Sequence, residues 1–350
     1  MPRIDAEALR AFGEHVIAAA GVDPEDARLL ANILLQADLN GYSGHGLSHL
    51  VSYVERWQQG VNRLDATPEI VHSGRATALI DGHFYIGQIV AHRAMSLAIE
   101  KAGDHGVGVV SVRRAGHMGR LADYVELAAD AGMIGIACVS VGGGNVAPFG
   151  GRQPVTGTNP IAFGVPGRDG EHIIFDFATA AMSMGELQRA VARAEPIPIG
   201  VMIDNEGNPT TDFSVFRGPP RGATLPFGGH KGAGMALMAE ILGGVLSGNG
   251  IGRDWLERGA AAINSGFFEA IAVDEFLPLD EFTAKVEELK EFVRTRKLAP
   301  GFSEVRLPGE GGRRRAAEQL RNGVEVEDDQ WEKLLQTAEA LGVTEVPAHR

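Results

Sequence analysis

The chain has 350 residues, 44% of them hydrophobic, so it can bury a large core, and its length predicts two or three lobes. With 45 acidic against 32 basic side chains, the formal net charge is −13, a field that repels nucleic acid and anionic lipid. The basic cluster 313–315 is too short to reverse that effect. We therefore expect neither a nucleic-acid partner nor binding to a membrane surface.

The single cysteine, Cys138, lies in the apolar stretch 133–141, which excludes an internal disulfide framework and a cysteine-rich metal site. Residues 1–21 mix acidic with apolar side chains and lack the core of a signal peptide. No apolar run approaches the roughly 20 residues that a membrane-spanning helix needs. These features predict a cytoplasmic protein.

The N-terminal third is predicted to be helical, because its apolar residues recur at helical spacing. Asp23 and Pro24 mark the start of a second helix and Asn40-Gly41 its end. A third helix is expected next, with His45 and His49 in its first turn.

From about residue 69 the pattern changes to an alternation of strands and helices, which predicts an α/β body. The C-terminal segment from about residue 311 returns to charged helices, which we expect to pack on the N-terminal ones. The expected elements of the body are strands at 70–71, 78–80, 107–112 and 134–141, with helices at 86–102 and 121–128.

The first candidate site is the segment 43–49, whose glycines leave space around His45. Histidine suits proton transfer because its unperturbed pKa of about 6.5 lies near neutral pH. A purely structural histidine fits the spacing equally well. His45 and His49 stand four residues apart, as metal ligands do. However, Gly46 takes the place where a zinc peptidase needs glutamate, and no third ligand is evident, so we expect no metal.

The second candidate site is Gly116-His117-Met118-Gly119-Arg120, between an expected strand and an expected helix. Loops at strand ends commonly carry ligand contacts. A histidine beside an arginine can combine proton transfer with carboxylate binding. The alternative is a turn with a solvated arginine.

The middle of the chain is rich in glycine, and its glycines stand beside Thr, Asn, His and Lys residues. Such segments can line a phosphate-bearing cofactor through backbone amides and a cation. However, no strand-Gly-x-Gly-x-x-Gly-helix fingerprint occurs, and the glycines of 229–234 are in the wrong order for a dinucleotide turn. A conventional Rossmann domain is therefore not expected.

Three motifs make the sequence recognisable: Gly157-Thr158-Asn159-Pro160, Phe175-Asp176-Phe177-Ala178-Thr179 and Gly228-Gly229-His230-Lys231-Gly232. With them, nearly the whole chain, as far as Pro308-Gly309-Glu310, resembles the malate/L-lactate dehydrogenase family that is unrelated to the Rossmann lactate and malate enzymes. That family also includes ureidoglycolate dehydrogenase, sulfolactate dehydrogenase, diketogulonate reductase and piperideine-carboxylate reductase.

The resemblance implies an α/β, non-Rossmann NAD(P)-binding fold with a mixed, largely antiparallel sheet and a helical lobe made from both chain ends. It also implies a homodimer. The domains expected are a helical lobe (1–68 with 311–350), a central α/β domain (69–120 with 225–310) and a cofactor-binding α/β region (121–224).

The resemblance further implies residue roles. His45 matches the histidine usually assigned as proton donor. His117 matches a second histidine that some members are thought to use as acid/base, and Asp176 matches an acid proposed to pair with the catalytic histidine. The residues expected to contact the cofactor, NAD or NADP, are Ser140, Thr158, Asp176, Phe177, Ala178, Thr179, His230, Lys231, Gly309 and Glu310.

The chain departs from the family pattern at two positions. Gly44 stands where the family usually has Ser, and His49 stands where it has an Arg that grips the substrate carboxylate. A neutral imidazole cannot offer the bidentate fork of a guanidinium. We therefore expect Arg120 to anchor the carboxylate, as in a subgroup with Gly-x-x-Gly-Arg at that point, and His49 and Asn159 to make further substrate contacts.

Together these features predict an NAD(P)-dependent enzyme that interconverts a small 2-oxo acid and its 2-hydroxy acid by hydride transfer, with histidine as acid/base. The expected partner is a small carboxylate substrate. Three alternatives remain open: a reductase of cyclic imines that carry a carboxylate, a metal-dependent lyase or hydrolase that uses His45 and His49, and a binding protein without turnover.

Overall fold

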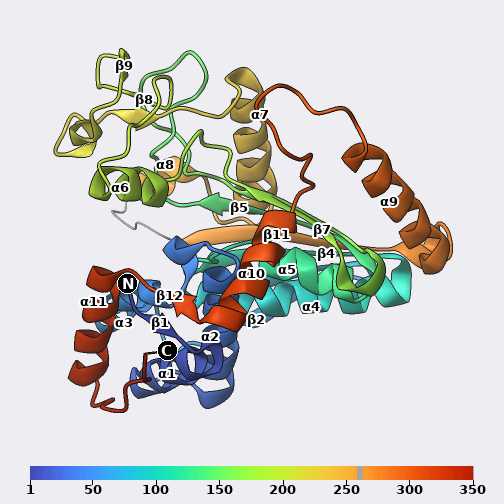
Figure 1. The fold of residues 1–350 in the computed structure, drawn as a ribbon, viewed down its shortest axis with the longest axis horizontal. Helices are drawn as coiled ribbons and strands as arrows, with labels where there is room; N and C mark the ends of the chain where they lie inside the picture. Colours follow the sequence, from blue (N-terminus) through green and yellow to red (C-terminus); the bar gives the residue numbers. More distant parts are fainter. Residues whose placement is uncertain (258–262, 350) are drawn as a thin grey trace.

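The computed structural model describes residues 1–257 and 263–349. Its centre is a seven-stranded sheet (Figure 1). In order across the sheet, the strands are β2 (Glu69–Ser73), β3 (Thr77–Asp81), β4 (Val107–Ala115), β11 (Asn264–Ala272), β5 (Met133–Val141), β6 (Ile161–Val165) and β7 (Ile173–Phe177). Among the described residues, β3 and β4 pair in parallel and the other neighbouring strands pair antiparallel. This confirms the mixed, largely antiparallel sheet and differs from the parallel sheet of a Rossmann domain.

Helices cover both faces of the sheet. On one face lie α4 (Gly87–His105) and α5 (Ala122–Asp130), and on the other lie α7 (His230–Ala239) and the π-helical segment η5 (Glu240–Val245) (Figure 1). Strand β11 is contacted by α4 on one face and by η5 on the other. In its middle, Phe268 is fully buried and meets the ring of Tyr124 from α5 edge-on.

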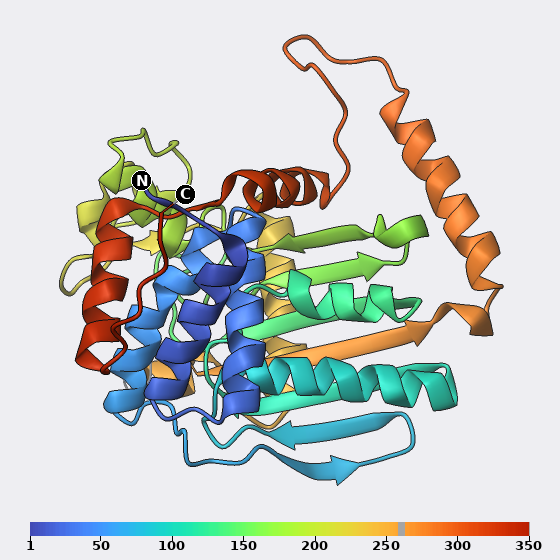
Figure 2. The same cartoon turned by 60° about the horizontal axis from the view of Figure 1, so that its bottom comes forward.

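Both chain ends build a helical lobe at one end of the sheet, as Figure 2 shows. Asp5 and Asp23 cap the first two helices through their carboxylates. The ends are tied together by β1 (Arg3–Ile4), which pairs with β12 (Val324–Glu325), and by the ring contact between Phe12 and Trp331. The predicted lobe is thus confirmed, and its helices are α1 (Ala6–Ala19), α2 (Pro24–Leu39), α3 (Leu50–Gln58), α10 (Glu310–Asn322) and α11 (Asp328–Ala340).

Smaller elements extend from this body. A three-stranded sheet forms from β8 (Met202–Ile203), β9 (Pro209–Thr210) and β10 (Ala223–Thr224) beside α6 (Met184–Ala192). Helix α8 (Gly252–Glu257) precedes β11, and α9 (Leu279–Arg294) projects from the sheet before a long connection returns to α10 (Figure 2). No helix of the described residues is long and apolar enough to cross a membrane.

The predicted boundary between 69–120 and 121–224 falls inside one continuous structure. Strand β4 belongs to the first of these regions and β5, β6 and β7 to the second, yet all lie in the same sheet. The two regions therefore share a core, and the domain boundaries stay predictions.

Candidate functional site

Three histidines from two distant segments form a cluster. The rings of His45 and His117 are nearly parallel with centroids 5.5 Å apart, and the ring of His49 lies 5.6 Å from that of His117. The sequence places His45 and His49 in one segment, but only the fold brings His117 to them. Within the described residues, no three His, Cys, Asp or Glu side chains are arranged to hold a metal ion, so the geometry gives the metal-dependent alternative no support.

His45 and His49 lie in two short 3₁₀ turns, Ser43–His45 and Leu47–His49, which precede α3. The prediction that both histidines occupy the first turn of an α-helix was therefore wrong. The reason is Gly46, which adopts an extended conformation between the turns. Its backbone passes so close to Asp38 that the carboxylate accepts the N–H of Leu47 at 2.8 Å.

His117 is carried by the loop between β4 and α5. Gly87, the first residue of α4, packs on this loop so tightly that a Cβ there would lie 2.1 Å from the carbonyl oxygen of Gly116. The start of α4 thereby fixes the loop and brings Gln88 beside it. Gln88 Nε2 lies 2.6 Å from Tyr53 Oη, and Tyr53 Oη lies 2.7 Å from His117 Nδ1.

Burial keeps all three histidines neutral near pH 7. Desolvation lowers the pKa of His45 and of His49 to about 4, and it lowers the pKa of His117 well below its usual value. Cations add to the effect: Arg120 acts on His45, and Arg56 acts on His49 and His117. An uncharged imidazole can both accept a proton and donate a hydrogen bond.

One fully buried ring nitrogen of the cluster has no hydrogen-bond partner among the described residues. The Nδ1 of His45 is buried and makes no hydrogen bond within the described part of the chain. Since buried polar atoms are nearly always paired, an atom left without a partner indicates a place where a bound molecule supplies the missing group.

Arg120 lies beside the cluster but is already engaged. Its guanidinium makes a buried ion pair with Asp123 and lies over the ring of Tyr42, with 5.5 Å between Cζ and the ring centroid. It also lines a cavity of about 240 Å³, together with Asp176 and Gly309. Three predicted site residues thus meet at one cavity, and Arg120 as carboxylate anchor stays a prediction.

Asp176, at the end of β7, accepts the backbone N–H of Ala122 at 2.9 Å. Burial raises the pKa of Asp176 to about 6, against the lowering effect of that hydrogen bond and of Arg120. Among the described residues no hydrogen bond joins Asp176 to a histidine, so its pairing with the catalytic histidine also stays a prediction.

Asn159 and Ser140 lie against the π-helical segment η5. The amide of Asn159 accepts the N–H of Val141 and donates to Glu240 Oε2 and to the carbonyl of Ala236. Ser140 Oγ donates to the same carboxylate oxygen at 2.9 Å. Asn159 is fully buried with its amide satisfied, so in this geometry it supports the fold, and its predicted contact with substrate is untested.

The remaining predicted cofactor residues lie at or just after the end of β7 and at the starts of α7 and α10. Phe177 and Ala178 follow Asp176, and Thr179 donates to the carbonyl of Thr158 at 2.8 Å. His230 and Lys231 begin α7, and Gly309 precedes α10. Glu310 forms an ion pair with Arg294. Neither helix start has a side-chain cap, which leaves backbone N–H groups for an anion.

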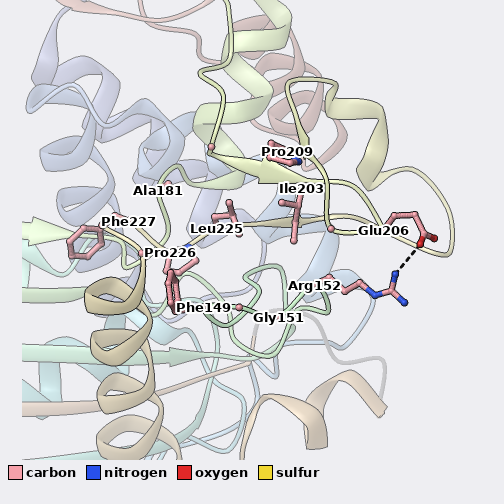
Figure 3. A pocket seen from close by; sticks show the side chains of 15 residues that line it. Phe149, Gly151, Arg152, Ala181, Ile203, Glu206, Pro209, Leu225, Pro226 and Phe227 are labelled. Carbon is pink, nitrogen blue, oxygen red and sulfur yellow. Dashed lines mark hydrogen bonds and ion pairs between the residues drawn. The ribbon is translucent and has the colours of Figure 1, made fainter.

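A larger cavity, of about 660 Å³, borders the loop before α7 and not the histidines (Figure 3). Its wall includes Phe149, Leu225 and Phe227 together with Gly228 and Gly229. Phe149 meets the ring of His230 edge-on at 5.8 Å. The cavity therefore adjoins the predicted cofactor segment, while the chemistry-bearing side chains surround the smaller cavity and the histidine cluster.

Sequence reasoning missed four side chains that shape the site: Asp38, Tyr53, Gln88 and Asp123. A signal existed for Tyr53, because it stands four residues after His49 and shares a helical face with it. Gln88 carried no such signal, since its partner Tyr53 is 35 residues away. Asp38 carried none either, since Leu47 stands nine residues on, beyond the i+3 and i+4 spacing of helical neighbours.

The comparisons with known proteins agree with this architecture. The model of the malate/L-lactate dehydrogenase family matches residues 4–335. A malate dehydrogenase of Pyrococcus horikoshii is 36% identical over 97% of this chain and 96% of its own. A putative malate/lactate dehydrogenase structure from Escherichia coli, 34% identical, superposes with a TM-score of 0.92 over 98% of this chain and 96% of that one.

A third relative has a different named activity. The structure of delta1-piperideine-2-carboxylate reductase from Pseudomonas syringae is 28% identical, with a TM-score of 0.84 over 97% of this chain and all of that one. Nearly every element described above is thus shared with dehydrogenases and a reductase of one architecture. The chain belongs to the malate/L-lactate dehydrogenase family of oxidoreductases.

Proposed function

We propose that the protein is an NAD(P)-dependent dehydrogenase that interconverts a small 2-oxo acid and its 2-hydroxy acid. The observation that carries this proposal is the half-buried cluster of His45, His49 and His117, in which the buried Nδ1 of His45 has no partner within the described residues. The named activities of the relatives support the same reaction class.

The histidine cluster supplies proton chemistry to this reaction. In the oxidation of a 2-hydroxy acid, a neutral imidazole takes the hydroxyl proton as the hydride leaves C2. The nicotinamide, when bound, supplies the redox chemistry by accepting or giving that hydride. Burial suits the imidazoles to this task because it keeps them in the proton-accepting form near neutral pH.

Arg120 is the proposed anchor for the substrate carboxylate. Its guanidinium lines the cavity that Asp176 and Gly309 also border, and a charge-assisted bond to a carboxylate would fix which face of C2 meets the cofactor. The residues proposed to hold NAD or NADP are those at the end of β7 and at the starts of α7 and α10, where uncapped N–H groups fit phosphate.

The experiment is to measure turnover of a panel of 2-hydroxy acids and nucleotide affinity in two variants. We expect His45→Ala and His117→Ala each to lower kcat by about 10²–10⁴-fold while nucleotide affinity stays unchanged. If both variants turn over the best substrate at the wild-type rate, the acid/base assignment is wrong. If the wild-type protein binds neither NAD nor NADP, the proposed function itself fails.

A second candidate, reduction of a cyclic imine beside a carboxylate, is favoured by the structural likeness to the piperideine-carboxylate reductase. Both reactions deliver hydride to a carbon next to a carboxylate. Both also need a proton donor, for the carbonyl oxygen of the 2-oxo acid or for the nitrogen of the imine. The two are separated by following oxidation of NADH and NADPH with pyruvate-like acids and with cyclic imines side by side.

We also propose that the protein is a cytoplasmic homodimer. Large apolar side chains are exposed in a row along α7, η5 and the residue that follows, and such a patch marks an association surface. They are Leu237, Met238, Ile241, Leu242, Val245 and Leu246. Sedimentation should show a dimer for the wild-type chain and a monomer for Leu242→Glu/Val245→Glu. A wild-type monomer at micromolar concentration would contradict the proposal.

A further inference from the structure

Three side chains from separate elements form a short hydrogen-bonded chain that ends at His117. Gln88 lies in the first turn of α4, Tyr53 lies on α3, and His117 lies in the loop after β4. The contacts are 2.6 Å between Gln88 Nε2 and Tyr53 Oη, and 2.7 Å between Tyr53 Oη and His117 Nδ1. Gln88 and Tyr53 are both buried, so their polar atoms need hydrogen-bond partners inside the protein.

The direction of each bond follows from the donor inventory of the groups. An amide nitrogen can only donate, so the oxygen of Tyr53 accepts from Gln88. The phenol has one proton, which is left for the second contact and can be given to His117 Nδ1. A neutral imidazole that accepts at Nδ1 carries its own proton on Nε2, since the partner of one ring nitrogen fixes the state of the other.

We propose that Gln88 and Tyr53 are positioning residues that hold His117 in the tautomer protonated at Nε2, so that His117 presents an N–H to the substrate oxygen. This inference rests on the proposed function and deepens it by dividing the roles of the histidines. His117 binds and polarises the oxygen on C2, and no proton leaves its ring. His45, whose Nδ1 has no partner among the described residues, is the group that exchanges a proton with the substrate.

The electrostatics of the cluster agree with this division. Desolvation keeps the pKa of His117 well below its usual value, and the neighbouring His45, His49 and Arg56 act in the same direction. Burial also raises the pKa of Tyr53, so the phenol keeps its proton and remains a donor. A neutral donor at a fixed position stabilises negative charge that develops on the substrate oxygen without reorganising.

The direct test is nitrogen NMR of the resting protein labelled with ¹⁵N-histidine, with the His117 signals assigned by their loss in His117→Gln. We expect Nε2 to show the shift of a protonated ring nitrogen and Nδ1 that of an unprotonated one. The opposite pattern would overturn the proposal. Because the measurement needs no substrate, it is independent of the proposed function. Absence of turnover would contradict the proposed function but would not change the tautomer that the spectrum reports.

Two variants test the chain itself. In Gln88→Glu, the carboxylate accepts a hydrogen bond from the phenol O–H, so the Tyr53 oxygen can only accept a hydrogen bond from His117. The tautomer of His117 should therefore reverse to Nδ1–H, and kcat should fall about 10- to 100-fold. Tyr53→Phe should remove the preference between tautomers and lower kcat to a similar extent, with nucleotide affinity unchanged. If both variants fold and keep the wild-type nitrogen shifts, Gln88 and Tyr53 do not set the tautomer.

The matched control is Tyr124→Phe. Tyr124 is also a fully buried tyrosine, and its hydroxyl supports the same loop by donating to the carbonyl of Met118. Neither a hydrogen bond nor a ring contact joins it to His117. Its removal should therefore leave the His117 nitrogen shifts unchanged, whereas a change equal to that in Tyr53→Phe would reduce the proposed role to general support of the loop and overturn it.

Discussion

Gly46 lies directly against the carboxylate of Asp38, so closely that a Cβ at Gly46 would stand 1.8 Å from Asp38 Oδ1. The same carboxylate accepts the backbone N–H of Leu47. One buried acid on α2 therefore holds the segment that carries His45 and His49, and a residue without a side chain is required where the segment crosses it.

The close approach predicts the effect of Gly46→Ala. The added methyl group must push Asp38 or the backbone aside, and such overpacking costs about 1–3 kcal/mol. We expect a loss of that size in the free energy of unfolding, with lower kcat because the histidines move. The control is Gly44→Ala, since nothing lies within 4 Å of a Cβ there. Equal losses in chemical denaturation for the two variants would contradict this explanation.

Asp38 itself should make stability depend on pH. Burial raises its pKa from 3.8 to about 7, so between these values the folded state holds a proton that the unfolded state has released. Its contribution to stability is complete below about pH 4 and is lost as the pH rises through 7. Asp38→Asn keeps an oxygen for Leu47 but cannot ionise. We expect the variant to gain stability over the wild type between pH 5 and 8, as denaturation at both pH values would show. A difference independent of pH would contradict the assignment.

The histidine cluster predicts the opposite trend in acid. The unfolded chain binds protons on its histidines near pH 6.5, but folded His49 does so only near pH 4. The free energy of unfolding should therefore fall as the pH drops from 6.5 toward 4, by about 1–2 kcal/mol for one such histidine at pH 5. His49→Gln should flatten the dependence, which chemical denaturation between about pH 4 and 6.5 measures. A slope unchanged from the wild type would rule out this source.

Arg120 has two roles that a double variant separates. Arg120→Ala should raise KM for the carboxylate substrate and also cost about 3–5 kcal/mol of stability, because Asp123 is left buried without its partner. Adding Asp123→Ala should restore most of the stability and leave KM high. If the double variant also recovers the wild-type KM, Arg120 acts only through Asp123 and is no anchor.

The sequence alone predicted several of the elements and named the candidate site residues, whose roles stay predictions. Helix signals such as Asp23-Pro24 are local, so they placed the start of α2 correctly. The strand-and-helix alternation predicted the α/β body, and the glycine spacing argued against a Rossmann domain, as the sheet confirms. The family motifs selected His45, His117 and Arg120, whose segments the fold brings together.

The partners of those residues were decided by the tertiary structure. Tyr53 and His117 are 64 residues apart, and Ser140 and Glu240 are 100 apart. Periodicity and capping describe only near neighbours along the chain, whereas hydrogen bonds of this kind exist only after sheet and helices pack. Burial, and with it every pKa shift in the cluster, likewise depends on what covers a side chain. The residue types fixed which chemistry was available, and packing fixed which atoms are free to perform it.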